Sequence, residues 1–143
     1  MAWAILADKK RWRELFPVSI LAVSLGLLSD VLMQFYPLWE YNGGHLLVSN
    51  LFDDFGCYIV VPYLFIQWLP EKNTFWTLWL YFFVWTGFAV GIEVFFLITG
   101  SISHNYWWKL QWSYLADWIL FWIFYKYYKI FKFGKLSPSK YLD

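Results

Sequence analysis

The chain has 143 residues, of which 61% are hydrophobic, 27% aromatic and only 15% charged, and its formal net charge is +1. About a quarter of the residues in a typical soluble domain are charged, so this composition favours an integral membrane protein in a lipid bilayer. The small net charge gives no reason to expect a nucleic-acid partner, and the single cysteine, Cys57, excludes an internal disulfide and a multi-cysteine metal site.

The first segment, MAWAILADKKRWRELF, mixes basic residues with Trp3, Leu6 and Trp12. One interpretation is a short N-terminal interfacial helix on the inner surface of the membrane, with its apolar side chains in lipid and its basic ones among the headgroups. A frayed basic end is the alternative, and the sequence leaves both open.

Four apolar stretches follow, and each is long enough to cross the hydrocarbon core of a bilayer, which takes about 20 helical residues. Proline and glycine fall in the links between them, and the stretches lack the alternation of membrane β-strands, so we expect helices. The predicted spans are residues 15–36, 46–68, 75–99 and 110–131, followed by a cytoplasmic tail, 132–143. The predicted fold is therefore all-α, a four-transmembrane-helix antiparallel bundle that forms a single domain over residues 1–143.

Lysine and arginine mark one side of this bundle. They precede the first span, lie between the second and third spans and follow the last one, whereas the other two loops contain only Lys109. Because basic residues accumulate on the cytoplasmic side of membrane proteins, the N- and C-termini are both predicted to be cytoplasmic. The other two loops, residues 37–45 and 100–109, are then on the outer side.

Each predicted span also contains an acidic residue, although a charge within the bilayer is costly. Counted from the outer loops, four of these acids lie seven or eight residues into their spans: Asp30, Asp53, Glu93 and Asp117. At about 1.5 Å per residue, they all lie about 10–12 Å from the outer ends of their helices. An antiparallel bundle would therefore gather four carboxylates at one level in the outer half of the bilayer.

Polar residues at helical spacing accompany the acids. They are Asn50 and Asp54 on one face with Asp53, Gln34 one turn after Asp30, and Ser113 one turn before Asp117. Polar stripes of this kind face the interior of a bundle rather than lipid. Adjacent residues on a helix point about 100° apart. Asp53 is therefore expected to face the centre, and Asp54 is either part of the pocket or packing support.

No lysine or arginine lies at the level of the acids to balance their charge. Such carboxylates must be protonated, share protons or hold a cation. The two histidines lie in the outer loops, and they are interpreted as metal ligands, proton carriers or ordinary interfacial residues. A divalent metal ion suits hard oxygen ligands, and its candidate ligands are Asp30, Asp53, Glu93, Asp117, His45 and His104.

Three functions stay open at this point, and whether the protein is an enzyme is one of the open questions. The preferred one is a pocket that binds a cation or relays protons. The second is a membrane-embedded enzyme that uses a buried acid as a general acid on a lipid or isoprenoid. The third is a structural subunit that assembles with itself or with another membrane protein. No motif in the sequence assigns a catalytic residue.

The segments YPLWEY (36–41) and GSISHNYWWKLQWSYLADW (100–118), together with Glu93, resemble landmarks of a known family. It is an uncharacterised family of small polytopic membrane proteins, found mainly in spore-forming Bacillus and Clostridium relatives. The resemblance extends over roughly residues 12–131 and implies a bacterial plasma membrane, but it implies no activity because the family has none established. It marks Glu40, Glu93, His104 and Trp108 as positions of interest, and the family often has an amide in place of Asp117.

Overall fold

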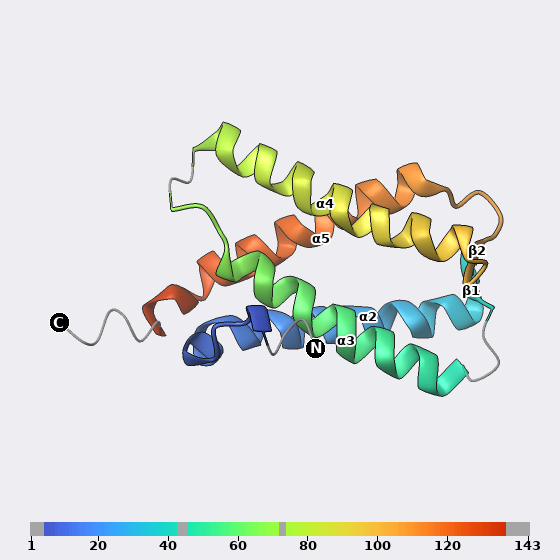
Figure 1. Ribbon diagram of the computed structural model, residues 1–143, viewed down its shortest axis with the longest axis horizontal. Helices are drawn as coiled ribbons and strands as arrows, with labels where there is room; N and C mark the ends of the chain where they lie inside the picture. Colours follow the sequence, from blue (N-terminus) through green and yellow to red (C-terminus); the bar gives the residue numbers. More distant parts are fainter. Residues whose placement is uncertain (1–4, 43–45, 72–73, 137–143) are drawn as a thin grey trace.

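The computed structural model describes residues 5–42, 46–71 and 74–136, and of residues 41 and 46–55 it describes the backbone alone. Four long helices dominate the fold (Figure 1). They are α2 (Trp12–Phe35), α3 (Leu46–Gln67), α4 (Phe75–Ile98) and α5 (Leu110–Ile130). The shorter elements are the 3-10 helices η1 (Lys9–Arg11) and η2 (Phe133–Leu136) and the strands β1 (Trp39–Tyr41) and β2 (Ile102–His104).

The four predicted helices are present, which confirms the all-α class. Three of them begin at the residue that the sequence predicts, and α2 begins at Trp12, three residues early. Their ends follow the chemistry of the links. Pro37 follows α2 and Gly100 follows α4 with a φ of +71°, a backbone conformation that glycine adopts without a steric penalty.

The helices are arranged as two pairs (Figure 1). Helix α2 packs along α3, and α4 packs along α5, so each pair consists of helices that follow one another in the chain. The pairs meet mainly through α5, which contacts both α2 and α3. We call the end of the bundle with η1 and η2 the basic end, and the end with β1 and β2 the outer end.

Aromatic side chains fill the bundle between its middle and its basic end. Phe65 of α3 is fully buried, and its ring centroid lies 4.7 Å from that of Phe121, 5.2 Å from Tyr81 and 5.8 Å from Trp85. Aromatic pairs at these separations add to the stabilisation that burial of their surface already gives. The core of the protein therefore lies on the basic-end side, because the buried residues of α2 and α3 cluster there as well.

Close packing of α2 on α3 depends on small residues. A Cβ atom added to Gly26 would lie 3.0 Å from the Tyr58 ring, so only glycine allows the present approach. Seven residues before Gly26 on α2, toward the basic end, the buried Ser19 hydroxyl donates a hydrogen bond to the Ile59 carbonyl of α3. The O–O distance is 2.9 Å. These contacts fix the position of α3 along α2.

Strands β1 and β2 form a small antiparallel sheet that the sequence does not predict. Trp39 pairs with His104 and Glu40 with Ser103, so the loop after α2 is joined to the loop after α4. The backbone N–H of Asn105 donates to the Leu38 carbonyl and extends the connection, with an N–O distance of 2.7 Å. The sheet therefore ties the two helix pairs together at the outer end.

The beginning of the chain folds back onto the end of α3. The Asp8 N–H donates to the Gln67 side chain at 2.8 Å, and the Gln67 amide donates to the Leu6 carbonyl at 2.9 Å. Residues 1–4 lie outside the described residues, and Trp3 is one of them. The interfacial-helix interpretation is therefore still a prediction.

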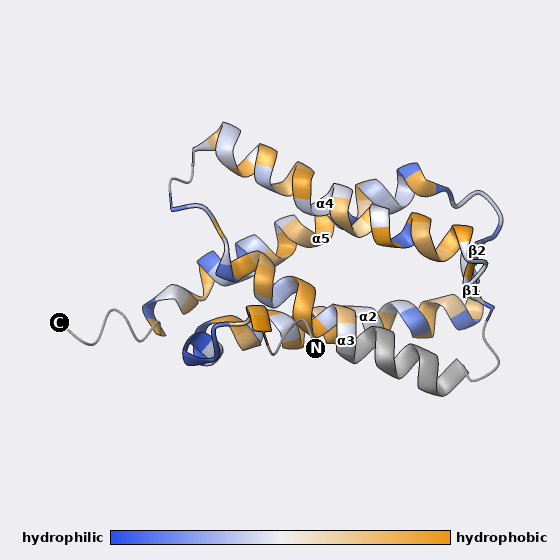
Figure 2. Cartoon of the chain, viewed as in Figure 1, coloured by the Kyte–Doolittle hydropathy of each residue, from blue (hydrophilic) through white to orange (hydrophobic). Residues whose placement is uncertain are grey.

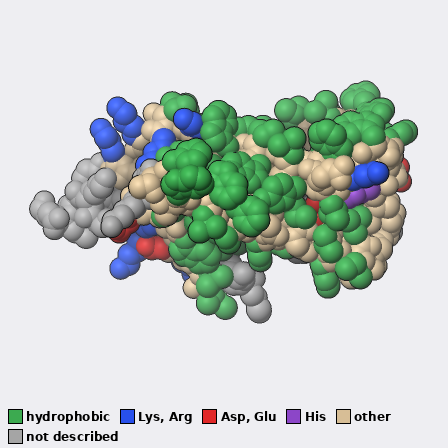
Figure 3. All heavy atoms as spheres, turned by 90° about the horizontal axis from the view of Figure 1, so that it is seen from above, with side chains coloured by type: hydrophobic (Ala, Val, Ile, Leu, Met, Phe, Trp, Pro, Cys, Tyr) green, Lys and Arg blue, Asp and Glu red, His purple; other side chains and the backbone are tan. Residues whose placement is uncertain are grey.

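The surface of the bundle is rich in large apolar side chains (Figure 3), and hydrophobic residues recur along the length of α4 (Figure 2). Within the described part of the chain, two helical segments are long and apolar enough to cross a membrane, Lys9–Phe35 and Phe75–Ile98. Only 11% of the most apolar stretch of Phe75–Ile98 is buried inside the chain. Figure 3 shows hydrophobic side chains over most of one face and most of its lysine and arginine side chains near one end.

Candidate functional site

A cavity of about 650 Å³ lies between the two helix pairs. All four long helices contribute to its wall, and Leu38, Trp39 and Ile102 close it at the outer end. Most of the lining is apolar, with a few polar side chains among it. Volumes of 300–1,000 Å³ with this kind of lining are typical of binding sites for small molecules.

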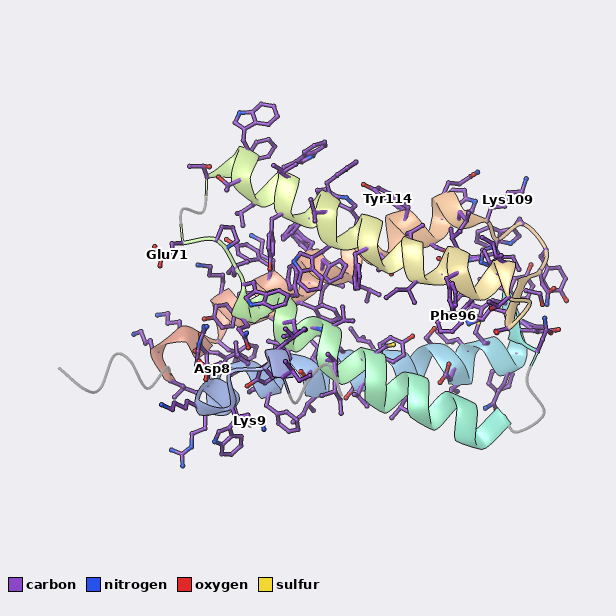
Figure 4. The ribbon with its side chains drawn as sticks, in the orientation of Figure 1. Asp8, Lys9, Glu71, Phe96, Lys109 and Tyr114 are labelled. Atoms are coloured by element: carbon purple, nitrogen blue, oxygen red, sulfur yellow. The ribbon has the colours of Figure 1, made fainter. Side chains whose placement is uncertain are left out.

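Small residues from three helices are part of the cavity wall. They are Gly26 on α2, Ala89 on α4 and Ala116 on α5. Nearer the basic end, the large side chains of Phe65 and Phe121 belong to the packed core, and Phe121 also borders the cavity. Phe96 of α4 also lines the cavity, and its side chain points from α4 toward the α2–α3 pair (Figure 4).

Glu93 of α4 is the centre of a hydrogen-bonded group on the cavity wall. Its Oε1 atom lies 2.7 Å from Nε2 of His104 and accepts a hydrogen bond of 2.6 Å from the Ser113 hydroxyl. The Trp108 indole N–H in turn donates to the Ser113 oxygen at 2.9 Å. We call Glu93, His104, Ser113 and Trp108 the Glu93 cluster.

The Glu93 cluster joins four parts of the chain that the fold brings to one place. Glu93 comes from α4, His104 from β2, Trp108 from the following loop and Ser113 from the first turn of α5. The side chains of His104 and Glu93 are only 14% and 20% exposed. When Glu93 is ionised, His104 donates its Nε2 proton to it, and such charge-assisted hydrogen bonds are stronger than neutral ones.

Asp117 lies one helical turn beyond Ser113 on α5 and lines the same cavity. It makes no hydrogen bond and no ion pair with any other described residue. The cavity wall therefore carries two carboxylates from facing helices. One has hydrogen-bond donors from the protein, and the other has none in the part of the chain that the structure describes.

Some of the remaining predicted site residues are described but lie away from the cavity, and the others lie outside the described residues. Asp30 is half-buried on α2 but does not line the cavity, whereas its neighbour Ser29 does. Gln34 and Glu40 are exposed. The side chains of Asn50, Asp53 and Asp54 lie outside the described residues, and so does the whole of His45.

The predicted level of four carboxylates is therefore seen only in part. Glu93 and Asp117 share the cavity, as their equal depth predicts, and His104 joins them from the outer loop. Among the described residues, no three side chains from His, Cys, Asp and Glu come together as a metal site. A metal site that includes Asp53 or His45 is still a prediction.

A second hydrogen-bonded acid, which the sequence analysis did not single out, lies at the basic end. Glu14 is 1% exposed and makes a double contact with the Arg11 guanidinium, at 2.7 Å and 2.8 Å. The Tyr128 hydroxyl also donates to Glu14. We call these three residues the Glu14 cluster. The only signal in the sequence is the spacing of Arg11 and Glu14 by three residues, which places them on one helix face.

The sequence matches no family model, no curated protein and no solved structure.

Proposed function

We propose that this protein is an integral membrane protein with four spans that binds and releases protons at a carboxylate cavity near its outer end. Glu93 is the proton-exchanging group, and His104 is the residue that shares the proton with it. The observation that carries the proposal is the 2.7 Å contact between Glu93 Oε1 and His104 Nε2 on the wall of the cavity.

The exposed surface supports the membrane placement. Leu80, Val84 and Phe88 of α4 are 58%, 59% and 56% exposed. Burying one large apolar side chain is worth about 1.5–3 kcal/mol, so a row of them facing water would be costly, whereas lipid suits them. The basic residues near η1 and η2 support cytoplasmic termini in a bacterial plasma membrane.

The geometry suits proton exchange because a carboxyl group and an imidazole share one hydrogen bond. In a partly apolar site, the pair prefers either two neutral partners or two opposite charges, and one proton moves between them. Ser113 and Trp108 hold Glu93 Oε1 in place through the chain of hydrogen bonds from α5. No other described residue bonds to Glu93 Oε2, so this atom is left for water or a ligand.

The proton function is preferred over a metal site because His104 and Ser113 already engage Oε1 of Glu93. A cation would have only Oε2 of Glu93 to bind without displacing one of them. The second candidate function is an enzyme that protonates a lipid or isoprenoid. The size and apolar lining of the cavity favour it, since such a substrate would lie beside the acid.

Labelling with dicyclohexylcarbodiimide tests the proton proposal. The reagent is apolar and reacts with protonated carboxyl groups. The carboxyl oxygen bonds to the carbodiimide carbon, the proton moves to nitrogen, and the adduct rearranges to a stable N-acylurea. With the full chain in phospholipid nanodiscs, we expect peptide mass spectrometry to find the adduct at Glu93, in rising amounts as the pH falls. The exposed Glu71 is the internal control and is expected to be unlabelled.

The His104→Asn variant tests the shared proton. Because the imidazole competes with Glu93 for the proton, its removal should increase labelling at Glu93 at a fixed pH. Absence of labelling at Glu93 at every pH, or equal labelling in the wild type and in His104→Asn, would refute the proposal. Protection of Glu93 by a divalent cation would instead favour the cation-binding function.

A further inference from the structure

We propose that the cavity binds a lipophilic amine, a molecule with an apolar chain and a head that donates hydrogen bonds to Asp117. This inference rests on the membrane placement proposed above and adds to it the chemical class of the ligand. It concerns Asp117 and the apolar wall, whereas the proton proposal concerns Glu93 and His104.

The chain of the ligand is inferred from the lining of the cavity. Apolar side chains from all four long helices, with leucine, isoleucine and phenylalanine prominent on α2, α4 and α5, make up most of the wall, in a volume of about 650 Å³. Contact with an apolar molecule removes this surface from water or replaces loosely held lipid. An entirely polar ligand would leave most of the wall without a complementary partner.

The head of the ligand is inferred from Asp117. A carboxylate that faces a cavity without a hydrogen-bond donor is costly, because desolvation is not compensated. Glu93 has Ser113 and His104 as donors, but no described residue donates to Asp117. A ligand amine would supply both the missing donor and the opposite charge.

The charges around the cavity exclude a ligand with an anionic head group. Among the described residues that line it there is no lysine or arginine, and the charged ones are Glu93 and Asp117. A phosphate or carboxylate head would therefore meet like charges without a cation to balance it. Charge complementarity favours an amine over an anionic lipid.

The ligand has a route of entry from the side of the bundle. Leu28 and Leu32 of α2 line the cavity, and both are 55% exposed. Ile119 of α5 also lines it and is 50% exposed. The apolar wall thus continues onto the outside surface of α2 and α5, and in a bilayer this surface faces lipid. An apolar chain can pass from the lipid into the cavity without crossing a polar layer.

Competition among three probes of equal chain length tests the inference. The full chain in phosphatidylcholine nanodiscs is incubated with equal amounts of tetradecylamine, tetradecanol and tetradecyl phosphate, and the retained molecules are counted by native mass spectrometry. We expect one tetradecylamine per protein, less tetradecanol and no tetradecyl phosphate. Retention of the phosphate at the level of the amine would overturn the inference.

The Asp117→Asn variant removes the charge and keeps the shape of the side chain. We expect it to retain tetradecylamine about tenfold more weakly, which is the usual effect of losing a hydrogen bond to a charged group. The matched control is Glu71→Gln, the same chemical change at an exposed carboxylate near the basic end, and it should behave as the wild type (Figure 4). Equal retention by the wild type and Asp117→Asn would overturn the assignment of the head.

A second variant, Ala89→Phe, fills the cavity without changing either carboxylate. We expect it to lose retention of both tetradecylamine and tetradecanol, and undiminished retention would show that the cavity is not the site. Failure of these experiments is distinguishable from failure of the proton proposal. Carbodiimide labelling of Glu93 in the same nanodiscs reports on the proton whether or not an amine binds.

Discussion

Glu14 and Glu93 are both carboxylates that accept hydrogen bonds inside the bundle, but their surroundings differ. Glu14 is almost completely buried at the basic end, where Arg11 balances its charge and Tyr128 adds a third donor. Glu93 is 20% exposed at the outer end, and it faces a cavity that also contains Asp117. Glu14 therefore has a complete set of protein partners, whereas Glu93 has a histidine on one side and the cavity on the other.

The comparison separates a carboxylate whose partners are complete from one that borders a cavity. A buried ion pair with complete hydrogen bonding holds segments together but has no reason to change its state. An acid beside a histidine and a cavity has partners that change with proton and ligand binding. The two ends therefore make different predictions for stability and for binding.

The largest effect on stability is expected for Glu14→Ala. The substitution removes the buried acceptor that the partly exposed Arg11 guanidinium and the Tyr128 hydroxyl share. We expect the free energy of unfolding to fall by about 3 kcal/mol, as for other broken buried ion pairs. Denaturant unfolding in mild detergent measures it, with Glu71→Ala as the exposed control within about 0.5 kcal/mol of wild type. A loss at Glu14 as small as at Glu71 would contradict the structural role.

Gly26→Ala is expected to have the next largest effect. The new methyl group would lie 3.0 Å from the Tyr58 ring and push α3 away from α2. We expect a loss of about 1–2 kcal/mol in the free energy of unfolding. The matched control is Gly91→Ala on α4, where no atom lies within 4 Å of the added Cβ among the described residues. Because alanine favours a helix over glycine, this control should be neutral or slightly stabilising.

Glu93→Gln is expected to change stability less than any change at Glu14. The amide oxygen still accepts the hydrogen bond from Ser113, so the free energy of unfolding should fall by about 1 kcal/mol. The same variant should lose carbodiimide labelling at position 93 completely. A stability loss equal to that of Glu14→Ala would show that Glu93 stabilises the fold as much as Glu14 does.

The smallest effect, and one of opposite sign, is expected for Thr86→Val. The Thr86 hydroxyl is buried without a hydrogen-bond partner among the described residues. Valine has almost the same shape and removes the uncompensated polar atom, so stability should be unchanged or rise by about 1 kcal/mol. Ser113→Ala is the contrasting variant, because its hydroxyl bonds both Trp108 and Glu93 and its loss should be destabilising. A clear loss of stability in Thr86→Val would indicate a partner for that hydroxyl.

The helices follow from the sequence because proline or glycine lies in each link between the apolar stretches. The meeting of Glu93 and Asp117 also follows, since equal depth on antiparallel helices brings side chains to one level. The contact between His104 and Glu93 is more specific than the sequence indicates. Loop position places His104 only near the mouth of the pocket, and the β1–β2 pairing decides its orientation.

Other features do not follow from local pattern. Strands of three residues lie below the length at which alternation is recognisable, and the partners of β1 and β2 are far apart in the chain. The cavity depends on which small residues face one another, and this requires the packing of all four helices. Glu14 attracts no attention in the sequence because an acid beside basic residues at the start of a span is expected to be exposed.

The pairing of β1 with β2 has a consequence for the order in which the protein assembles. Each helix pair consists of neighbours in the chain, so α2–α3 and α4–α5 can each form as a local hairpin. The sheet connects the loop within the first pair to the loop within the second, and contacts between distant segments form late because they close long loops. His104 reaches Glu93 only when this sheet has formed. The Glu93 cluster is therefore incomplete until the two hairpins have come together.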